Sequence, residues 1–190
     1  MLEQALSNGA QVDARDEYGA TALMEAARFG HKCAVQMLLR HGASIRARAP
    51  NGRTVLMAAI LTEVNEPVIS ELLSAGADVN AVDDDGETAL MMISSFAGPK
   101  HMRVLKRLIR AGARVNAVSN DWKSALMYAA ENSSEQAVTI LIKNGADVNA
   151  RDANGLNAIA YARQDPDYTE DDDREIIDLL VKAGARDDVP

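Results

Sequence analysis

Short apolar segments alternate with polar, glycine-containing segments along the whole chain. One kind of apolar segment opens with Thr-x-Leu-Met, as at residues 21–24, and the next kind is a Leu-rich run that ends before a Gly-Ala pair, as at residues 33–40. The first kind has the spacing of an amphipathic helix, and its Thr or Ser can cap the helix start. The glycine after the second kind can take the left-handed conformation that ends a helix. The pattern therefore predicts pairs of short helices, of which 21–29 and 33–40 form one.

This pattern recurs at a nearly fixed interval. The Gly-Ala pairs begin at residues 9, 42, 76, 112, 145 and 184, so the intervals are 33, 34, 36, 33 and 39 residues. Between one pair and the next helix lies a turn, which reads Asp-x-x-Gly at residues 16–19, 83–86 and 152–155 and favours a hairpin-like loop. A fixed period with fixed punctuation indicates a repeat architecture. The predicted units are a partial N-terminal repeat, 1–15, and five full repeats, 16–48, 49–82, 83–118, 119–151 and 152–190, of which the last is a C-terminal capping repeat with an insertion.

The period, the Gly-Ala pairs, the Asp-Val-Asn segments and the Thr-x-Leu motif together resemble the ankyrin repeat over essentially the whole chain. This resemblance implies an all-α solenoid of stacked helix-turn-helix units joined by hairpin-like loops, in a single domain over 1–190. Family repeats usually read Thr-Pro-Leu-His, whereas here Ala or Val stands at the Pro position and Met24, Met57, Met91 and Met127 stand at the His position. Since Met is expected only to pack, we expect less rigid loops than in the family.

Two repeats depart locally from the pattern. Repeat three is three residues longer than repeat one, and we expect the extra length around 94–99, where Gly98 and Pro99 punctuate the chain. Repeat four has Trp122 where the other full repeats have glycine. Because Trp is a poor occupant of a positive-φ position, we expect Asn120 to carry that turn in a reshaped loop.

Composition and charge narrow the classes of function. The net charge is −8 and the isoelectric point is near 4.9, which argues against binding nucleic acid backbones. Cys33 is the single cysteine, and this favours a reducing compartment. The first ten residues lack the features of a secretory signal, and no apolar run approaches the length of a membrane span. We therefore expect a monomer in the cytoplasm, with the nucleus left open, that binds neither nucleic acid nor membrane.

No constellation of residues predicts catalysis. The stretches 83–86 and 152–155 look superficially like calcium loops, but the register lacks the first-position Asp and the twelfth-position Glu of an EF-hand. His31, His41, His101 and Cys33 have no zinc-ligand spacing. No glycine-rich phosphate loop or nucleophile elbow is present. We expect no catalytic site, no metal site and no cofactor, and so not an enzyme.

Basic residues are concentrated in one segment. Residues 100–114 contain six Lys or Arg and no acid, whereas 165–175 contain seven acids and one Arg. Lys100, Arg103, Arg107 and Arg110 fall at helical spacing and share one face. This face is either a solvated outer surface or a docking patch for an acidic partner, and both interpretations stay open at this point.

Ankyrin domains are protein-recognition modules, so the resemblance implies that this chain binds a protein partner on a concave face of hairpin tips and first helices. The same resemblance assigns partner binding to a set of eight residues: Tyr18, Arg28, Phe29, Arg53, Leu61, Phe96, Trp122 and Lys123. Phe29 and Phe96 are either apolar anchors or covers for a helix end. Two alternative functions remain. The chain is either the targeting or substrate-recognition part of a larger enzyme or effector, or a structural assembly unit.

Overall fold

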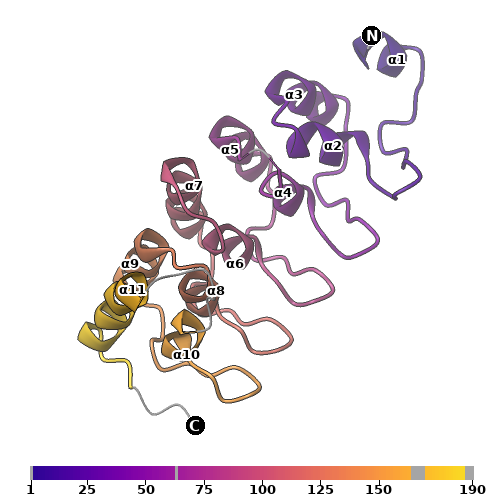
Figure 1. Ribbon diagram of the computed structural model, residues 1–190. Helices are drawn as coiled ribbons and strands as arrows, with labels where there is room; N and C mark the ends of the chain where they lie inside the picture. The colour runs from indigo at the N-terminus through magenta and orange to yellow at the C-terminus, as the bar shows by residue number, and fades with distance from the viewer. Residues whose placement is uncertain (1, 63, 164–169, 187–190) are drawn as a thin grey trace. The chain divides into compact units, whose positions relative to one another are not determined.

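The computed structural model describes residues 2–62, 64–163 and 170–186 (Figure 1). In this part of the chain the regular elements are helices, joined by loops in which three isolated bridges close hairpins. The expected all-α fold is therefore confirmed. The chain divides into two compact units, 1–84 and 85–190. The first half of the insertion expected in the last repeat, 164–169, lies outside the described residues.

The first unit consists of a terminal helix and two helix pairs. Its helices are α1 (Leu2–Ser7), α2 (Ala22–Arg28), α3 (Lys32–Arg40), α4 (Val55–Ala58) and α5 (Glu66–Ser74). Within this unit α2 and α4 lie on the side of the hairpin loops, and α3 and α5 form the other layer (Figure 1). The interior between the layers is aliphatic, with these side chains almost wholly buried: Leu23, Leu38, Leu56, Ile69 and Leu72. Each contributes about 2 kcal/mol of hydrophobic free energy.

The second unit consists of three helix pairs. Its helices are α6 (Ala89–Ser94), α7 (Pro99–Arg110), α8 (Ala125–Glu131), α9 (Glu135–Lys143), α10 (Ala158–Ala162) and α11 (Glu170–Lys182). Helices α6, α8 and α10 form the layer beside the hairpins, and α7, α9 and α11 form the other (Figure 1). The buried residues between the layers are again mostly aliphatic: Leu90, Ile93, Leu105, Leu108, Leu126, Leu141 and Ile159.

The extra residues of repeat three lie in α7. This helix has 12 residues, whereas α9 has 9. The first helix with its following connection has the same length in both repeats, 89–98 and 125–134. The extra length therefore begins at Pro99, at the end of the stretch 94–99 where it was expected, and it lengthens the helix and not the connection before it. The chain instead adds a turn to the start of α7, where Pro99 is tolerated because the first helical N–H needs no intrahelical acceptor.

Trp122 adopts the conformation of the glycines it replaces. Its φ is +62°, close to the +75° of Gly86 and the +81° of Gly155. The Trp122 N–H donates to the Ser119 carbonyl at 2.9 Å, as the Gly155 N–H donates to the Asp152 carbonyl at 3.0 Å. The expectation that Asn120 carries a reshaped turn is therefore wrong. Because a left-handed conformation costs an ordinary residue about 1–2 kcal/mol, Trp122 holds local backbone strain.

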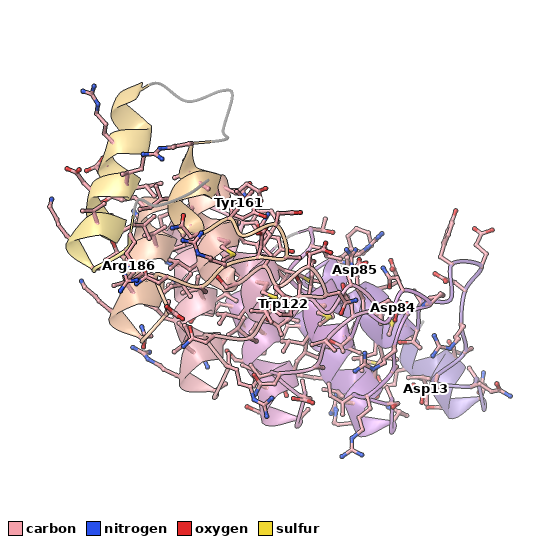
Figure 2. The ribbon with its side chains drawn as sticks, turned by 90° about the horizontal axis from the view of Figure 1, so that it is seen from below. Asp13, Asp84, Asp85, Trp122, Tyr161 and Arg186 are labelled. Carbon is pink, nitrogen blue, oxygen red and sulfur yellow. The ribbon has the colours of Figure 1, made fainter. Side chains whose placement is uncertain are left out.

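The space next to this position also differs between repeats. A Cβ added to Gly86 would lie 2.6 Å from the Asn120 side-chain oxygen. At the corresponding position of the next hairpin stands Ala153, whose backbone N–H donates to the Asp121 carbonyl at 2.9 Å. Ala153 has a much smaller side chain than Asn120, so it leaves room for the indole. Trp122 and Asp85 both lie in the hairpins of the second unit (Figure 2).

Three of the four methionines at the family's His position do more than pack. The N-cap residues Thr54, Thr88 and Ser124 each accept a hydrogen bond from the N–H of the Met three residues later. In return the Met sulfur accepts the N-cap N–H, at 3.4 Å in all three cases. This reciprocal pair is a capping box in which Met replaces the usual Glu or Gln. The expectation that Met can only pack is therefore wrong.

Candidate functional site

A groove of about 700 Å³ crosses the hairpin side of the first unit. It is formed by the first hairpins and by α2 and α4, and four of the eight expected partner-binding residues line it: Tyr18, Arg28, Arg53 and Leu61. Tyr18 stands at a hairpin tip and is 76% exposed, and Leu61 follows α4 and is 39% exposed. The structure thus brings an exposed aromatic, an exposed aliphatic and two guanidinium groups to one hollow.

Both arginines of this groove are held by carboxylates. Arg28 lies 3.4 Å from Glu25 on the same helix, and Arg53 lies 3.6 Å from Asp83, whose side chain is almost fully buried. The Nε atoms of both arginines are buried. The Arg53 Nε is the atom that faces the Asp83 carboxylate at 3.6 Å, just beyond hydrogen-bond distance, whereas the Arg28 Nε has no hydrogen-bond acceptor among the described residues. Native structures satisfy nearly all such donors. The Arg28 guanidinium therefore has a donor that the described part of the unit does not use, whereas the Arg53 Nε is directed at a carboxylate of the unit.

Phe29 lies outside the residues that line this groove. It is the C-cap residue of α2, and its ring lies 4.6 Å from the Arg28 guanidinium carbon and 6.2 Å from the His31 ring centroid. Phe29 is still 44% exposed. The local contacts thus orient the Phe29 ring without burying it.

Phe96 has a similar setting in the second unit. Its ring stacks on His101 with 5.2 Å between centroids, and it is 37% exposed. Its backbone carbonyl accepts a hydrogen bond from the Ser134 hydroxyl at 3.4 Å. Phe96 therefore also combines an ordered position with a partly open ring.

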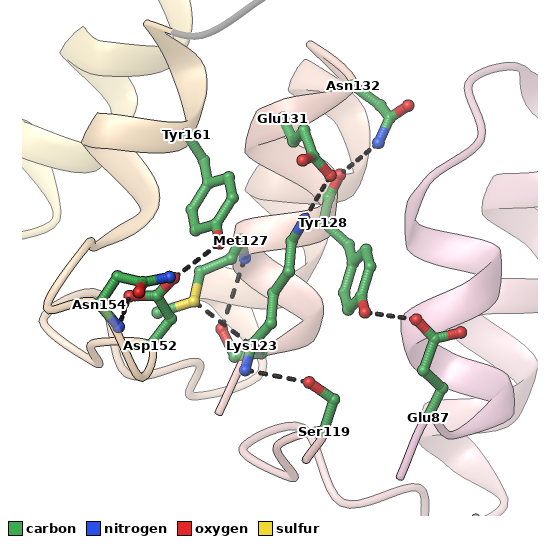
Figure 3. A network of polar contacts seen from close by, with 11 residues as sticks. Glu87, Ser119, Lys123, Met127, Tyr128, Glu131, Asn132, Asp152, Asn154 and Tyr161 are labelled. Atoms are coloured by element: carbon green, nitrogen blue, oxygen red, sulfur yellow. Dashed lines mark hydrogen bonds and ion pairs between the residues drawn. The ribbon is translucent and has the colours of Figure 1, made fainter. Parts of the chain in front are cut away.

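The second unit carries a polar network around Lys123 (Figure 3). The Lys123 ammonium lies 4.3 Å from the ring centroids of both Tyr128 and Tyr161 and 2.5 Å from a Glu131 carboxylate oxygen. Its side chain is 13% exposed. A cation between two aromatic faces is stabilised by both ring quadrupoles. Although Lys123 was expected to contact a partner, its charge is engaged within the unit.

The two tyrosine hydroxyls extend this network to neighbouring repeats. Tyr128 donates to the Glu87 carboxylate, and Tyr161 donates to Asp152 at 2.8 Å. Burial raises the pKa of both phenols well above 10.0, and the hydrogen bonds to carboxylates raise them further. Burial alone would raise the pKa of Asp152, but hydrogen bonds from Tyr161, Leu156 and Asn154 hold it below its ordinary value of 3.8. The network therefore fixes three successive hairpins to the helices beside them.

Trp122 is the exposed neighbour of this network. Its side chain is 62% exposed, whereas the adjacent Lys123 is nearly buried. Sequence reasoning singled out Trp122 and Lys123 but missed the tyrosines. A signal for them was available, because Tyr128 and Tyr161 directly follow the Ser-Ala-Leu-Met and Asn-Ala-Ile-Ala motifs and are 33 residues apart.

The described residues give no sign of other chemistry. No helix among them is both long enough and apolar enough to cross a bilayer. They also hold no group of three or more His, Cys, Asp or Glu side chains placed to bind a metal ion. Cys33 is exposed and makes no disulfide.

Comparison with known proteins gives the chain a family. The family model described as ankyrin repeats (three copies) matches residues 1–83, 61–152 and 92–189. The chain is 33% identical over 166 residues to the putative palmitoyltransferase ZDHHC13 of Danio rerio, a match that covers 86% of this chain and 25% of that protein. It is 39% identical over 92 residues to the E3 ubiquitin-protein ligase KEG of Arabidopsis thaliana, covering 47% of this chain and 6% of the ligase.

A third relative is named for the repeat itself. The ankyrin repeat domain-containing protein SAT10 of Stachybotrys chartarum is 37% identical over 90 residues, 47% of this chain and 5% of that protein. In all three cases the match spans a quarter or less of the relative's length. The family model, in contrast, extends over nearly the whole chain, and its repeats are the helix pairs and hairpins described above. The chain therefore belongs to the ankyrin repeat family.

Proposed function

We propose that this chain is a non-enzymatic protein-binding module whose partner occupies the side formed by the hairpin tips and first helices. Ankyrin repeats generally bind proteins, and this gives the class of function. The observation that carries the choice of side is the groove of the first unit, in which Tyr18, Leu61 and two arginines converge. Aromatic residues and Arg dominate the energetics of most protein interfaces.

The state of the arginines supports this choice. Because the Nε donor of Arg28 lacks an acceptor among the described residues, a partner carboxylate that reorients this guanidinium would add hydrogen bonds. Bidentate pairing of Arg with carboxylate is among the stronger protein hydrogen bonds. The proposed partner therefore presents an apolar side chain to Tyr18 and Leu61 and an acidic group to the arginines.

In the second unit the proposal assigns direct contact to Trp122 and an indirect role to Lys123. A strained backbone position is retained in proteins when the surrounding structure holds it, and such positions gather at functional sites. Lys123 and its two tyrosines would keep the Trp122 hairpin in place instead of touching the partner. Phe29 and Phe96 are proposed as peripheral contacts, each on its own unit.

A photo-crosslinking experiment tests this assignment. A benzophenone amino acid replaces Tyr18 in one variant and Val181 in another, since Val181 is 48% exposed on α11, which lies in the other layer of helices. The variant at 18 should form a discrete crosslinked species with a cellular protein, and the variant at 181 should not. Equal crosslinking of the same protein from both positions, or crosslinking from 181 alone, would reject the proposed side.

A second candidate is that the chain is the recognition part of a larger enzyme or effector. The relatives favour it, because the matched repeats are 6% of a protein named as a ubiquitin ligase and 25% of one named as a putative palmitoyltransferase. The mass of the endogenous polypeptide separates the two. A species of about 20.4 kDa supports a repeat-only module, and a much larger polypeptide carrying these residues supports the second candidate.

A further inference from the structure

A second groove lies on the other layer of the second unit, between α7 and α9. It has a volume of about 500 Å³, and Met102, Ile109 and Ile140 supply its apolar part. Lys106, Arg110 and Lys143 also line it, against one acid, Glu135. The chain as a whole has a net charge of −8. This groove is thus a basic site on an acidic protein.

The first unit contains a matching groove with different chemistry. It lies between α3 and α5, has a volume of about 530 Å³, and is lined by residues that include Gln36, Arg40, Glu71 and Ser74. There the Gln36 amide donates to the Glu71 carboxylate at 2.8 Å, which joins the two helices across the groove. One cation faces one acid, so this groove carries no excess charge.

The repeat register aligns the two grooves residue by residue. Counting back from Gly42 and Gly112, Lys106 takes the place of Gln36 and Arg110 that of Arg40. Counting back from Gly76 and Gly145 in the same way, Ile140 replaces Glu71 and Lys143 replaces Ser74. The second unit has therefore lost the bridging hydrogen bond and its acid, and has gained two cations and an apolar wall.

Helix electrostatics account for only part of this charge. Arg110 and Lys143 lie in the last turns of α7 and α9, where cations complement the helix dipole. Lys106 lies before the last turn of α7, so the dipole does not explain it. None of the three forms an ion pair with another described residue. Three neighbouring cations repel one another, and an anionic ligand would remove this cost.

We propose that the α7–α9 groove binds an acidic, amphipathic segment of a partner protein. Carboxylates of the segment would pair with Lys106, Arg110 and Lys143, and its apolar side chains would cover Ile109 and Ile140. A membrane surface fits less well, because Met102 is buried and the two isoleucines are half-buried instead of projecting. Nucleic acid fits less well too, because no aromatic residue lines the groove. This surface is distinct from the hairpin side and does not depend on the function proposed above.

Fluorescence anisotropy with a defined probe tests the proposal. The probe is a labelled amphipathic helical peptide of Glu and Leu, and the control peptide has every Glu replaced by Gln. The protein should bind the Glu peptide, with affinity falling as salt rises from 50 to 300 mM, and should not bind the Gln peptide. Failure to bind the Glu peptide, or equal binding of both peptides, would overturn the proposal.

Matched charge reversals locate the site. Lys106→Glu with Lys143→Glu should weaken binding of the Glu peptide at least tenfold. The control pair Lys32→Glu with Arg40→Glu makes the same charge change on α3 and should alter the affinity less than twofold. A milder pair, Lys106→Gln with Lys143→Ser, introduces the residues of the α3–α5 groove and should also weaken binding of the Glu peptide. This pair replaces the charge reversals as the test if they perturb folding. Equal effects of the two reversal pairs would reject the groove. The proposal would also be rejected if the protein bound phosphatidylserine vesicles through Lys106 and Lys143 but did not bind the Glu peptide.

Discussion

The Met127 sulfur lies 3.4 Å from the Ser124 backbone nitrogen and accepts a hydrogen bond from its N–H, while the Met127 N–H donates to the Ser124 hydroxyl. The same exchange joins Thr88 to Met91 and Thr54 to Met57. A thioether is a weak acceptor. In a buried site, however, it satisfies a backbone donor that would otherwise have no partner, and such a donor costs about 1–3 kcal/mol.

Removing the sulfur should therefore destabilise the second unit. Met91→Leu keeps the volume and loses the acceptor, whereas Met92→Leu makes the same chemical change on the same helix, and no described contact uses the Met92 sulfur. Urea unfolding should show Met91→Leu to be less stable than Met92→Leu by about 1 kcal/mol. Equal stability of the two variants would mean that these methionines only pack.

The left-handed conformation of Trp122 makes a separate prediction. Trp122→Gly relieves the backbone strain and Trp122→Ala does not, although both remove the indole. The Gly variant should be more stable than the Ala variant by about 1 kcal/mol in urea unfolding. Most glycine substitutions destabilise a folded chain through the entropy of the unfolded state. An Ala variant as stable as the Gly variant would show that position 122 carries no strain.

The Asp152 carboxylate predicts a pH dependence. Hydrogen bonds hold its folded pKa below the ordinary 3.8, so the charged form is favoured in the folded state. This contribution to stability is present above pH 3.8 and is lost as the pH falls through the folded pKa. Asp152→Asn should lose less stability than the wild type between pH 5 and the folded pKa of Asp152.

Acid changes the stability of the chain as a whole, so a matched control is needed. Asp121→Asn removes one carboxylate from the neighbouring hairpin, where the side chain is exposed. Its unfolding free energy should fall with pH about as steeply as that of the wild type. If the Asp152 and Asp121 variants show the same slope, the hydrogen bonds from Tyr161, Leu156 and Asn154 do not stabilise the carboxylate.

The alternation of apolar and polar residues predicted the helix pairs, and the resemblance to the ankyrin repeat implied how they stack. Thr and Ser caps, Leu-rich runs and terminating glycines depend on local chemistry, so their spacing placed the helices of both units close to where they lie. The predictions failed for Trp122 and for the methionines, where an unusual residue occupies a position whose backbone conformation is the same in every repeat. Trp122 keeps the glycine conformation because the hairpin bonds on either side hold it, and sequence alone does not weigh those bonds against strain.

The candidate sites were less readable. The resemblance to the ankyrin repeat implied exposed aromatics at the hairpin tips, but the burial of Lys123 depends on two tyrosines from successive repeats meeting around one ammonium. The basic segment 100–114 was visible as charge. Which of its members face a groove depends on packing against α9, and the structure selects Lys106 and Arg110 together with Lys143, which lies outside that segment.

The most direct test of the account measures the affinity of the crosslinked partner for hairpin-side variants. Tyr18→Ala with Leu61→Ala truncates the exposed aromatic and the exposed aliphatic side chain of the groove, and Val181→Ala truncates an exposed aliphatic residue on α11. The double variant should keep its helical signal in circular dichroism. By isothermal titration calorimetry it should bind the partner at least tenfold more weakly, a loss of about 1.4 kcal/mol in binding free energy. Val181→Ala should bind like the wild type. A well-folded double variant with unchanged affinity would contradict the claim that this side of the repeats receives the partner.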